Sequence, residues 1–170
     1  AVELLSPHCQ KVFYSARQEQ LRDYSSLCGG DAIADTFLNL GPLGGILSAM
    51  RSHPDARWLV TAIDLPALDT KTIKHLIDSK NSFKFATAYL SQDEQYIEPL
   101  CAIYEPKCYG ALLNALSANT LCPTKILKTI NTQLVKQLPQ TNSLYNANTP
   151  LDYKKFKKHS EESHEQCATY

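Results

Sequence analysis

The feature of the sequence that most constrains the fold is an apolar run at residues 58–63, which ends at Asp64 and is followed by Pro66. The run is too short for a typical helix and holds three β-branched residues, so we predict a strand buried on both faces, as in parallel sheets. Asp64 then stands at the carboxyl end of this strand, the edge where ligands bind in open α/β sheets. Position alone leaves two interpretations of Asp64 open: a carboxylate that binds Mg²⁺ beside a phosphate, or an aspartate that caps a helix or lies on the surface.

The charge balance of the chain argues against partners that depend on a strong overall field. The 170 residues include 17 Lys and Arg and 17 Asp and Glu, so the formal net charge is zero. This length fits one domain with a substantial core, and the zero charge argues against nucleic-acid or anionic-membrane partners. No apolar run approaches the ~18 residues of a membrane-spanning helix, and the first residues do not resemble a signal peptide. Any phosphate ligand must therefore be held by local geometry.

The cysteines and histidines form no pattern typical of a metal or disulfide framework. Six cysteines are spread along the chain without a C-x-x-C pair, and five histidines form no spaced cluster with them. This usage predicts reduced, mostly packed thiols in a cytoplasmic protein.

A second informative stretch runs from Gly41 to Met50. Gly41 fits a helix cap and Pro42 the first helical position, and apolar residues then recur at the spacing of a buried helix face. Gly44 and Gly45 would each destabilise the first turns of such a helix by about 1 kcal/mol. Either the helix packs very closely on a strand, or its backbone approaches a flat ligand. For the three glycines together we favour the approach of a ligand.

Strands and helices alternate through the chain. We predict strands at 11–16, 58–64, 83–90 and 96–104, and a short strand or loop at 32–35. Helices are expected at 2–5, 18–27, from 42, from 69, at 107–116, at 124–138 and from 150. Glu98 and Pro99 stand at the start of the strand at 96–104, which suits an edge strand or the entrance of a strand better than a central ladder. The alternation predicts an α/β fold, a three-layer α/β/α sandwich with a mostly parallel sheet.

Three polar residues end extended segments and are candidates for a ligand site. Asp35 closes the short strand at 32–35, although a simple turn aspartate explains it locally. Asn146 and Asn148 lie two residues apart just before Pro150, so in an extended segment both amides point the same way and reach one polar ligand. The alternative is that Asn148 or Thr149 only caps the last helix.

The order and spacing of these landmarks resemble those of the MobA family, the bacterial molybdenum cofactor guanylyltransferases. The landmarks are Asp35, Gly41–Gly45 (G-P-L-G-G), Asp64–Pro66 (D-L-P) and Asn146–Pro150 (N-A-N-T-P). The resemblance implies a Rossmann-like nucleotidyltransferase domain over residues 1–155, followed by a charged carboxy-terminal helix or tail at 156–170. It also implies the roles of individual residues: Gly41, Pro42, Leu43 and Gly45 lie near the guanine and ribose, Asp35 lines the nucleotide site, Asp64 binds Mg²⁺, and Asn146 and Asn148 bind molybdopterin.

The activity implied by the resemblance is the transfer of GMP from GTP to molybdopterin, or to its molybdenum complex, with release of pyrophosphate. The cofactor would be Mg²⁺, and proteins of molybdoenzyme maturation are possible further partners. Two alternatives stay open. The first is cytidylyl transfer to the same cofactor, or nucleotidyl transfer to a sugar phosphate. The second is a non-catalytic module that binds the cofactor.

One departure from the family pattern concerns the beginning of the fold. The family opens with a strand and a glycine-rich loop of the L-A-G-G-x-S-x-R-M-G-x-D-K kind, and no segment here matches it. Gly29 and Gly30 form the only other glycine pair and lack the arginine and lysine that follow in the family. We therefore expect an amino-terminally truncated member, inactive alone, with two strand edges facing the place of the absent strand.

Overall fold

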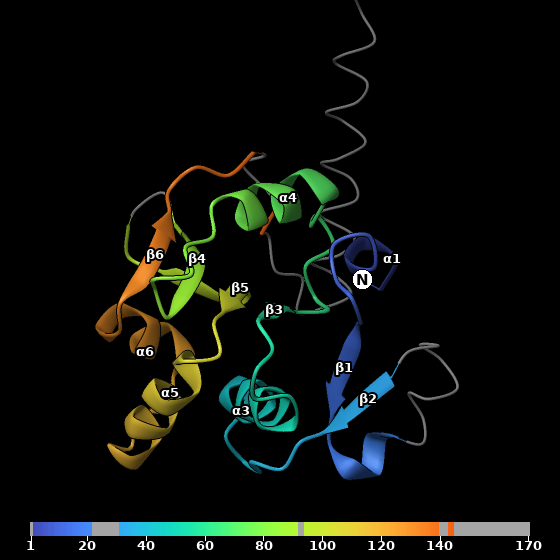
Figure 1. Ribbon diagram of the computed structural model, residues 1–170, viewed down its shortest axis with the longest axis vertical. Coiled ribbons are helices and arrows are strands. Elements are labelled where there is room, and N and C mark those ends of the chain that lie inside the picture. The colour runs from blue at the N-terminus through green and yellow to red at the C-terminus, as the bar shows by residue number, and fades with distance from the viewer. Residues whose placement is uncertain (1, 22–30, 92–93, 140–142, 145–170) are drawn as a thin grey trace, which may run out of the picture.

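The computed structural model describes residues 2–21, 31–91, 94–139 and 143–144 (Figure 1). Its elements are, in chain order, α1 (Val2–Leu5), β1 (Phe13–Ala16), the 3-10 helix η1 (Gln18–Gln20), β2 (Asp31–Ala34), α3 (Pro42–Ser52), β3 (Trp58–Thr61), α4 (Thr70–Asp78), β4 (Ala86–Leu90), β5 (Ile97–Tyr104), α5 (Cys108–Ser117), α6 (Pro123–Thr129) and β6 (Thr132–Val135). None of the helices in these described residues is long and apolar enough to cross a membrane.

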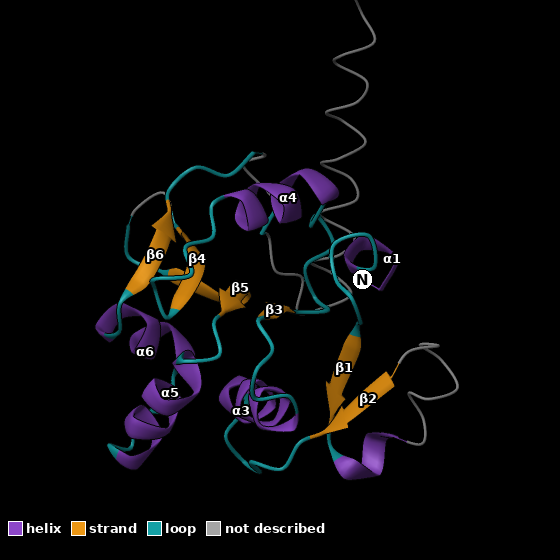
Figure 2. Cartoon of the chain, viewed as in Figure 1, coloured by secondary structure: helices purple, strands orange, loops and turns teal. Residues whose placement is uncertain are grey.

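The described strands form two sheets (Figure 2). β1 and β2 pair in parallel, and the other four follow the order β3-β5-β4-β6. β4 and β6 are parallel, whereas β5 runs antiparallel to both β3 and β4. The mostly parallel arrangement that we predicted therefore holds for every strand except β5.

The placement of β5 at a sheet edge was wrong, because β5 lies between β3 and β4, whereas Glu98 and Pro99 do lie at the entrance of the strand, as its second and third residues. Pro99 is tolerated in this inner strand because neither ladder needs its missing N–H donor. On one side the paired residues of β3 and β5 end at Thr61 and Cys101, with one further bond from Ala62 N to Leu100 O. On the other side the register with β4 shifts between Ala88 and Leu90, which leaves Pro99 beside an irregular stretch.

Apolar side chains from the sheet pack into two clusters, one on each face. In β4, Ala86 and Ala88 join a cluster with α3, α5 and α6, whereas Tyr89 joins a second cluster with α1 and α4. This alternation is the two-residue period of a strand. Helices therefore cover both faces (Figure 1), which confirms the predicted three-layer α/β/α sandwich.

Helix α3 contacts both sheets. It packs on β1 and β2 of one sheet and on β3 of the other, and the ring centroids of Phe13 in β1 and Trp58 in β3 lie 5.7 Å apart. Among the described residues, however, β1 pairs only with β2 and β3 only with β5, so each is an edge strand. All four residues of β3 are only half-buried, and the prediction that this strand is buried on both faces was wrong for this reason.

The carboxy-terminal part of the predicted helix at 124–138 was also wrong. Helix α6 ends at Thr129, and Thr132–Val135 pairs in parallel with β4. The short apolar pattern of this segment fits the period of a helix as well as that of a strand. The segment forms a strand because the edge of β4 offers hydrogen-bond partners for its backbone. The helix expected from residue 69 is confirmed, since Asp69 caps α4 by accepting a bond of 2.8 Å from Thr72 N.

Four of the cysteines lie in described residues, and all four are free thiols, as the sequence predicted. Cys101 and Cys108 are buried in the two cores. Burial raises the pKa of each of these two thiols to about 12, so both stay protonated and unreactive near neutral pH.

An ion pair joins β3 and β5 at the end of their ladder. Arg57 precedes β3 and Glu105 follows β5, and Arg57 Nε donates to Glu105 Oε1 at 2.6 Å. The Glu105 residue is only 5% exposed, so its carboxylate depends on this partner in place of water.

We expect Arg57→Gln to lower the free energy of unfolding by about 1 to 3 kcal/mol, because it removes a charged partner of a buried carboxylate. Urea unfolding of the two proteins measures the difference. Lys74→Gln, which changes an exposed cation on α4, is the matched control and should shift stability by less than about 0.5 kcal/mol. Equal effects of the two substitutions would contradict the role given to Arg57.

Candidate functional site

The carboxyl ends of β1 and β2 bring a hydroxyl, a carboxylate and a glycine together. The backbone N–H of Asp35 donates to Ala16 O at 2.9 Å and so extends the ladder by one residue. Ser15 Oγ donates to Asp35 Oδ1 at 2.5 Å. A Cβ on Gly45 of α3 would lie 2.8 Å from Ser15 Oγ and 3.7 Å from Asp35 Oδ1. The structure therefore joins two predicted site residues, Asp35 and Gly45, through a serine that the sequence analysis did not select.

The start of α3 divides the remaining predicted residues into exposed and buried ones. Gly41 caps the helix with a φ of 55°, a left-handed conformation that favours glycine, and Pro42 follows as an exposed first residue. Leu43 is fully buried in the core, unlike the exposed Gly41 and Pro42 that precede it. Gly44 is glycine for packing, because a Cβ there would lie 2.3 Å from the backbone oxygen of Phe37.

Asp64 lies in the turn that follows β3, half-buried, and a second carboxylate faces it. Glu98 of β5 is also half-buried, and its Oε1 accepts a bond of 2.9 Å from Leu100 N. Burial raises the pKa of Glu98, the Leu100 N–H lowers it, and the negative charge of Asp64 raises it further. The register of β3 and β5, which pairs Thr61 with Cys101 and continues with the bond from Ala62 N to Leu100 O, brings Glu98 to the same edge of the sheet as Asp64.

The donor set around Asp64 fits Mg²⁺ in the form that this ion takes in phosphate-transfer sites. Mg²⁺ prefers oxygen ligands and is commonly held by one or two carboxylates, with water and substrate phosphates completing its shell. The described residues contain no group of three or more His, Cys, Asp or Glu that would form a closed metal site. Asp64, with Glu98 beside it, therefore suits an ion that arrives with a nucleotide.

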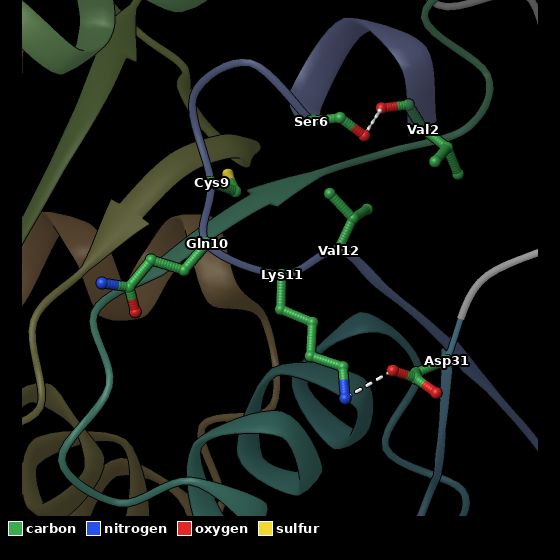
Figure 3. Close-up of a pocket in the computed structure, with 7 residues that line it drawn as sticks. All are labelled: Val2, Ser6, Cys9, Gln10, Lys11, Val12 and Asp31. Carbon is green, nitrogen blue, oxygen red and sulfur yellow. Dashed lines mark hydrogen bonds and ion pairs between the residues drawn. The ribbon is translucent and has the colours of Figure 1, made fainter.

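Two cavities help to delimit the site. One of about 260 Å³ is lined by Leu4 of α1 and by residues of the connection from β3 to α4, Leu65 and Pro66 among them but not Asp64. Another of about 420 Å³ is bordered by Lys11 and Asp31 at the amino ends of β1 and β2 (Figure 3). Since the ends of these strands that carry Ser15 and Asp35 are the opposite ones, the larger cavity is not part of the candidate site.

Two further site predictions, Asn146 and Asn148, lie outside the described residues, as does the proposed tail at 156–170. Their relation to the group of Ser15, Asp35 and Gly45 stays a prediction.

Comparisons with known proteins show the family of this chain. The family described as the MobA-like NTP transferase domain matches residues 1–136. The chain belongs to this family. The resemblance that the sequence landmarks indicated is therefore confirmed.

Individual relatives of the MobA-like chain carry names from molybdenum cofactor synthesis. A "Molybdenum cofactor biosynthesis bifunctional protein" of Synechocystis sp. is 32% identical over 151 residues, which cover 89% of this chain and 43% of that protein. A "Probable molybdenum cofactor guanylyltransferase" of Clostridium perfringens is 23% identical over 163 residues, covering 89% of this chain and 77% of that protein. The chain thus spans less than half of the Synechocystis relative.

A solved structure supports the fold of the MobA-like chain. The crystal structure of molybdopterin-guanine dinucleotide biosynthesis protein A from Archaeoglobus fulgidus matches with a TM-score of 0.75 at 24% identity, covering 95% of this chain and 83% of that one. At this identity the likeness establishes the α/β nucleotidyltransferase fold.

Sequence reasoning missed Ser15 and Glu98 as members of the site. A signal for Ser15 was present, because it stands near the carboxyl end of a predicted strand, as Asp35 and Asp64 do. Glu98 gave no such signal, because it stands at the beginning of its strand, and only the antiparallel direction of β5 brings it to the same edge as Asp64.

The packing of Gly44 gives a stability prediction with a control in the same protein. Gly44→Ala should lower the free energy of unfolding by about 1 to 3 kcal/mol, because the new methyl group collides with the Phe37 carbonyl. Gly110→Ala in α5, where a Cβ meets nothing within 4 Å, should instead raise it by up to about 1 kcal/mol, since alanine favours helices. Thermal and urea unfolding of both variants measure these changes. Equal effects of the two substitutions on stability would contradict the role given to the Phe37 carbonyl, since only the Gly44 variant meets it.

Proposed function

We propose that this MobA-like domain transfers GMP from GTP to the terminal phosphate of molybdopterin, or of its molybdenum complex, and releases pyrophosphate. The observation that supports it best is the convergence of Ser15, Asp35 and Gly45 at the carboxyl ends of β1 and β2. Exposed polar groups beside a glycine are typical of a nucleotide that approaches the backbone closely. The chain's family adds support, since its relatives carry names of guanylyltransferases and cofactor biosynthesis proteins.

In this proposal Asp64 holds Mg²⁺ at the mouth of β3, and the half-buried carboxylate is fixed there by the turn between β3 and α4. When bound, Mg²⁺ neutralises charge on the phosphates and on the leaving pyrophosphate. The substrate phosphate is itself the nucleophile, so the protein needs no covalent intermediate and contributes position and charge. A chain with zero net charge depends on such local placement, because it has no overall field to attract a triphosphate.

The remaining residues of the proposal bind the two substrates. Asp35 accepts hydrogen bonds and does not donate them when ionised, so it suits the N–H groups of a base or the hydroxyls of a ribose. Guanine and ribose would contact the backbone of Gly41, Pro42 and Gly45, where little or no side chain stands in the way. We assign Asn146 and Asn148 to molybdopterin by the family pattern, and a cytoplasmic location stays a prediction as well.

Two other functions remain as alternatives to be tested. Cytidylyl or sugar-phosphate nucleotidyl transfer would use the same Asp64 chemistry with a different base or acceptor, and titration with CTP and GTP distinguishes these. A non-catalytic module would bind molybdopterin without turning over any nucleotide.

Asp64→Asn should abolish GMP transfer in the active protein while the fold stays intact. The amide keeps the size of the side chain but loses the charge that attracts Mg²⁺. Steady-state turnover with saturating GTP and Mg²⁺ is the measurement, with circular dichroism to check the fold. Asp78→Asn, at the exposed end of α4, is the control and should keep normal turnover. Near-normal turnover of Asp64→Asn would return Asp64 to a surface or capping role.

The edge positions of β1 and β3 predict weak GTP binding by the 170 residues alone. Each unpaired backbone group that stays buried costs roughly 1 to 3 kcal/mol, which favours a partner strand beside β1 or β3. Addition of a family-type strand and glycine-rich loop, fused or as a separate peptide, should therefore raise affinity for GTP and Mg²⁺ in isothermal titration. The control is a peptide of the same composition in scrambled order. Micromolar binding by the 170 residues without any addition would contradict this prediction.

A further inference from the structure

Ser48 is a polar residue in the apolar face of α3, and none of the chemistry proposed above uses it. It is 2% exposed, and two nearby residues of the same helix, Leu47 and Met50, belong to the apolar core. A buried hydroxyl in such surroundings is costly unless its hydrogen bonds are made.

The hydroxyl of Ser48 joins the loop after β2 to the first turn of α3. Ser48 Oγ donates to Gly44 O at 2.7 Å, a bond that serines inside helices commonly make. It also accepts from the backbone N–H of Thr36 at 2.8 Å, and Phe37 N lies at 3.3 Å. A hydroxyl has one donor and two acceptor positions, so these contacts use its full capacity.

The groups that Ser48 joins are direct neighbours of the candidate nucleotide site. Thr36 follows Asp35, whose carboxylate accepts from Ser15, and Gly44 precedes Gly45. The backbone of the loop touches the backbone of the helix at this point, because Phe37 O packs directly against Gly44. Further along the loop Leu38 is exposed, whereas Leu40 packs against the apolar core, so the hydrogen bonds to Ser48 hold the end of the loop that carries Asp35.

We propose that Ser48 is a positioning residue for the nucleotide site, and that its hydroxyl holds the loop from Asp35 to Gly41 against α3. The proposal rests on the function proposed above in so far as the ligand of this site is a nucleotide. Without the hydroxyl, the Thr36 and Phe37 amides lose their buried acceptor. The loop then leaves α3, and Asp35 loses its fixed relation to Gly45.

The test compares Ser48→Ala with Ser52→Ala. Ser52 lies one turn further along the same helix, and its hydroxyl donates to Ala49 O without contacting the loop. Isothermal titration of GTP with Mg²⁺ and turnover of the active protein are measured for both. We expect Ser48→Ala to raise the Kd and KM for GTP at least about fivefold with a smaller change in kcat, and Ser52→Ala to leave all three within about twofold.

Amide hydrogen exchange tests the geometry independently of the ligand. In Ser48→Ala the Thr36 and Phe37 amides should exchange faster, while amides in the middle of α3 keep their protection. Ser48→Cys fills a similar space but accepts hydrogen bonds weakly, so it should shift both readouts in the same direction and serves if the alanine variant is too unstable to titrate.

The outcomes separate the two proposals. If the wild-type active protein binds no nucleotide, the proposed function fails, and amide exchange still decides whether Ser48 holds the loop. If exchange at Thr36 and Phe37 rises while GTP affinity stays within about twofold of wild type, Ser48 has only a structural role and the positioning proposal is overturned. Unchanged exchange in both variants would overturn it as well.

Discussion

The packing of α3 on β1, β2 and β3 is the contact on which the rest of the structure depends. No backbone ladder connects the two described sheets, so their relation is set by side chains: the apolar face of α3 and the contact of Phe13 with Trp58. The packing of α3 and the contact between the two aromatic rings are both less directional than hydrogen bonds. The same helix carries Gly41, Gly44 and Gly45 at its start, and the element that holds the sheets together thereby also places the candidate site.

The site that results uses local geometry instead of charge. One described group holds the hydroxyl of Ser15 and the carboxylate of Asp35 beside the start of α3. Asp64 and Glu98 form a second group at the end of β3. A set of carboxylates repels a polyphosphate unless a cation stands between them, and the oxygen donors around Asp64 suit Mg²⁺. The electrostatics of the described site are therefore consistent with a nucleotide that binds as its magnesium complex.

The glycines show how packing and function share the same residues. Because glycine lowers helix stability, we favoured the approach of a ligand as the explanation for all three. The structure gives a separate reason for each. Gly44 makes room for the Phe37 carbonyl, Gly41 adopts a left-handed φ, and Gly45 leaves room for the Ser15 hydroxyl that binds Asp35. Packing explains Gly44, and of the three only Gly45 borders the polar group of the site, so the approach of a ligand stays a prediction there beside the contact with Ser15.

The sequence by itself determined the features that depend on neighbouring residues. These are the start of α3 at Gly41 and Pro42, the Asp69 cap of α4, and the alternation of strands and helices that gives a three-layer sandwich. The order of the landmarks also determined the family, because spacing along a chain needs no structure to be read. The tertiary structure alone decided the pairing: that β5 runs antiparallel between two strands, that Thr132–Val135 is a strand on β4, and that β3 is an edge. It alone brought Ser15 to Asp35, Glu98 to the Asp64 edge and Ser48 to the loop. These contacts join residues far apart in the chain, and the free energy that selects them comes from partners that no local pattern contains.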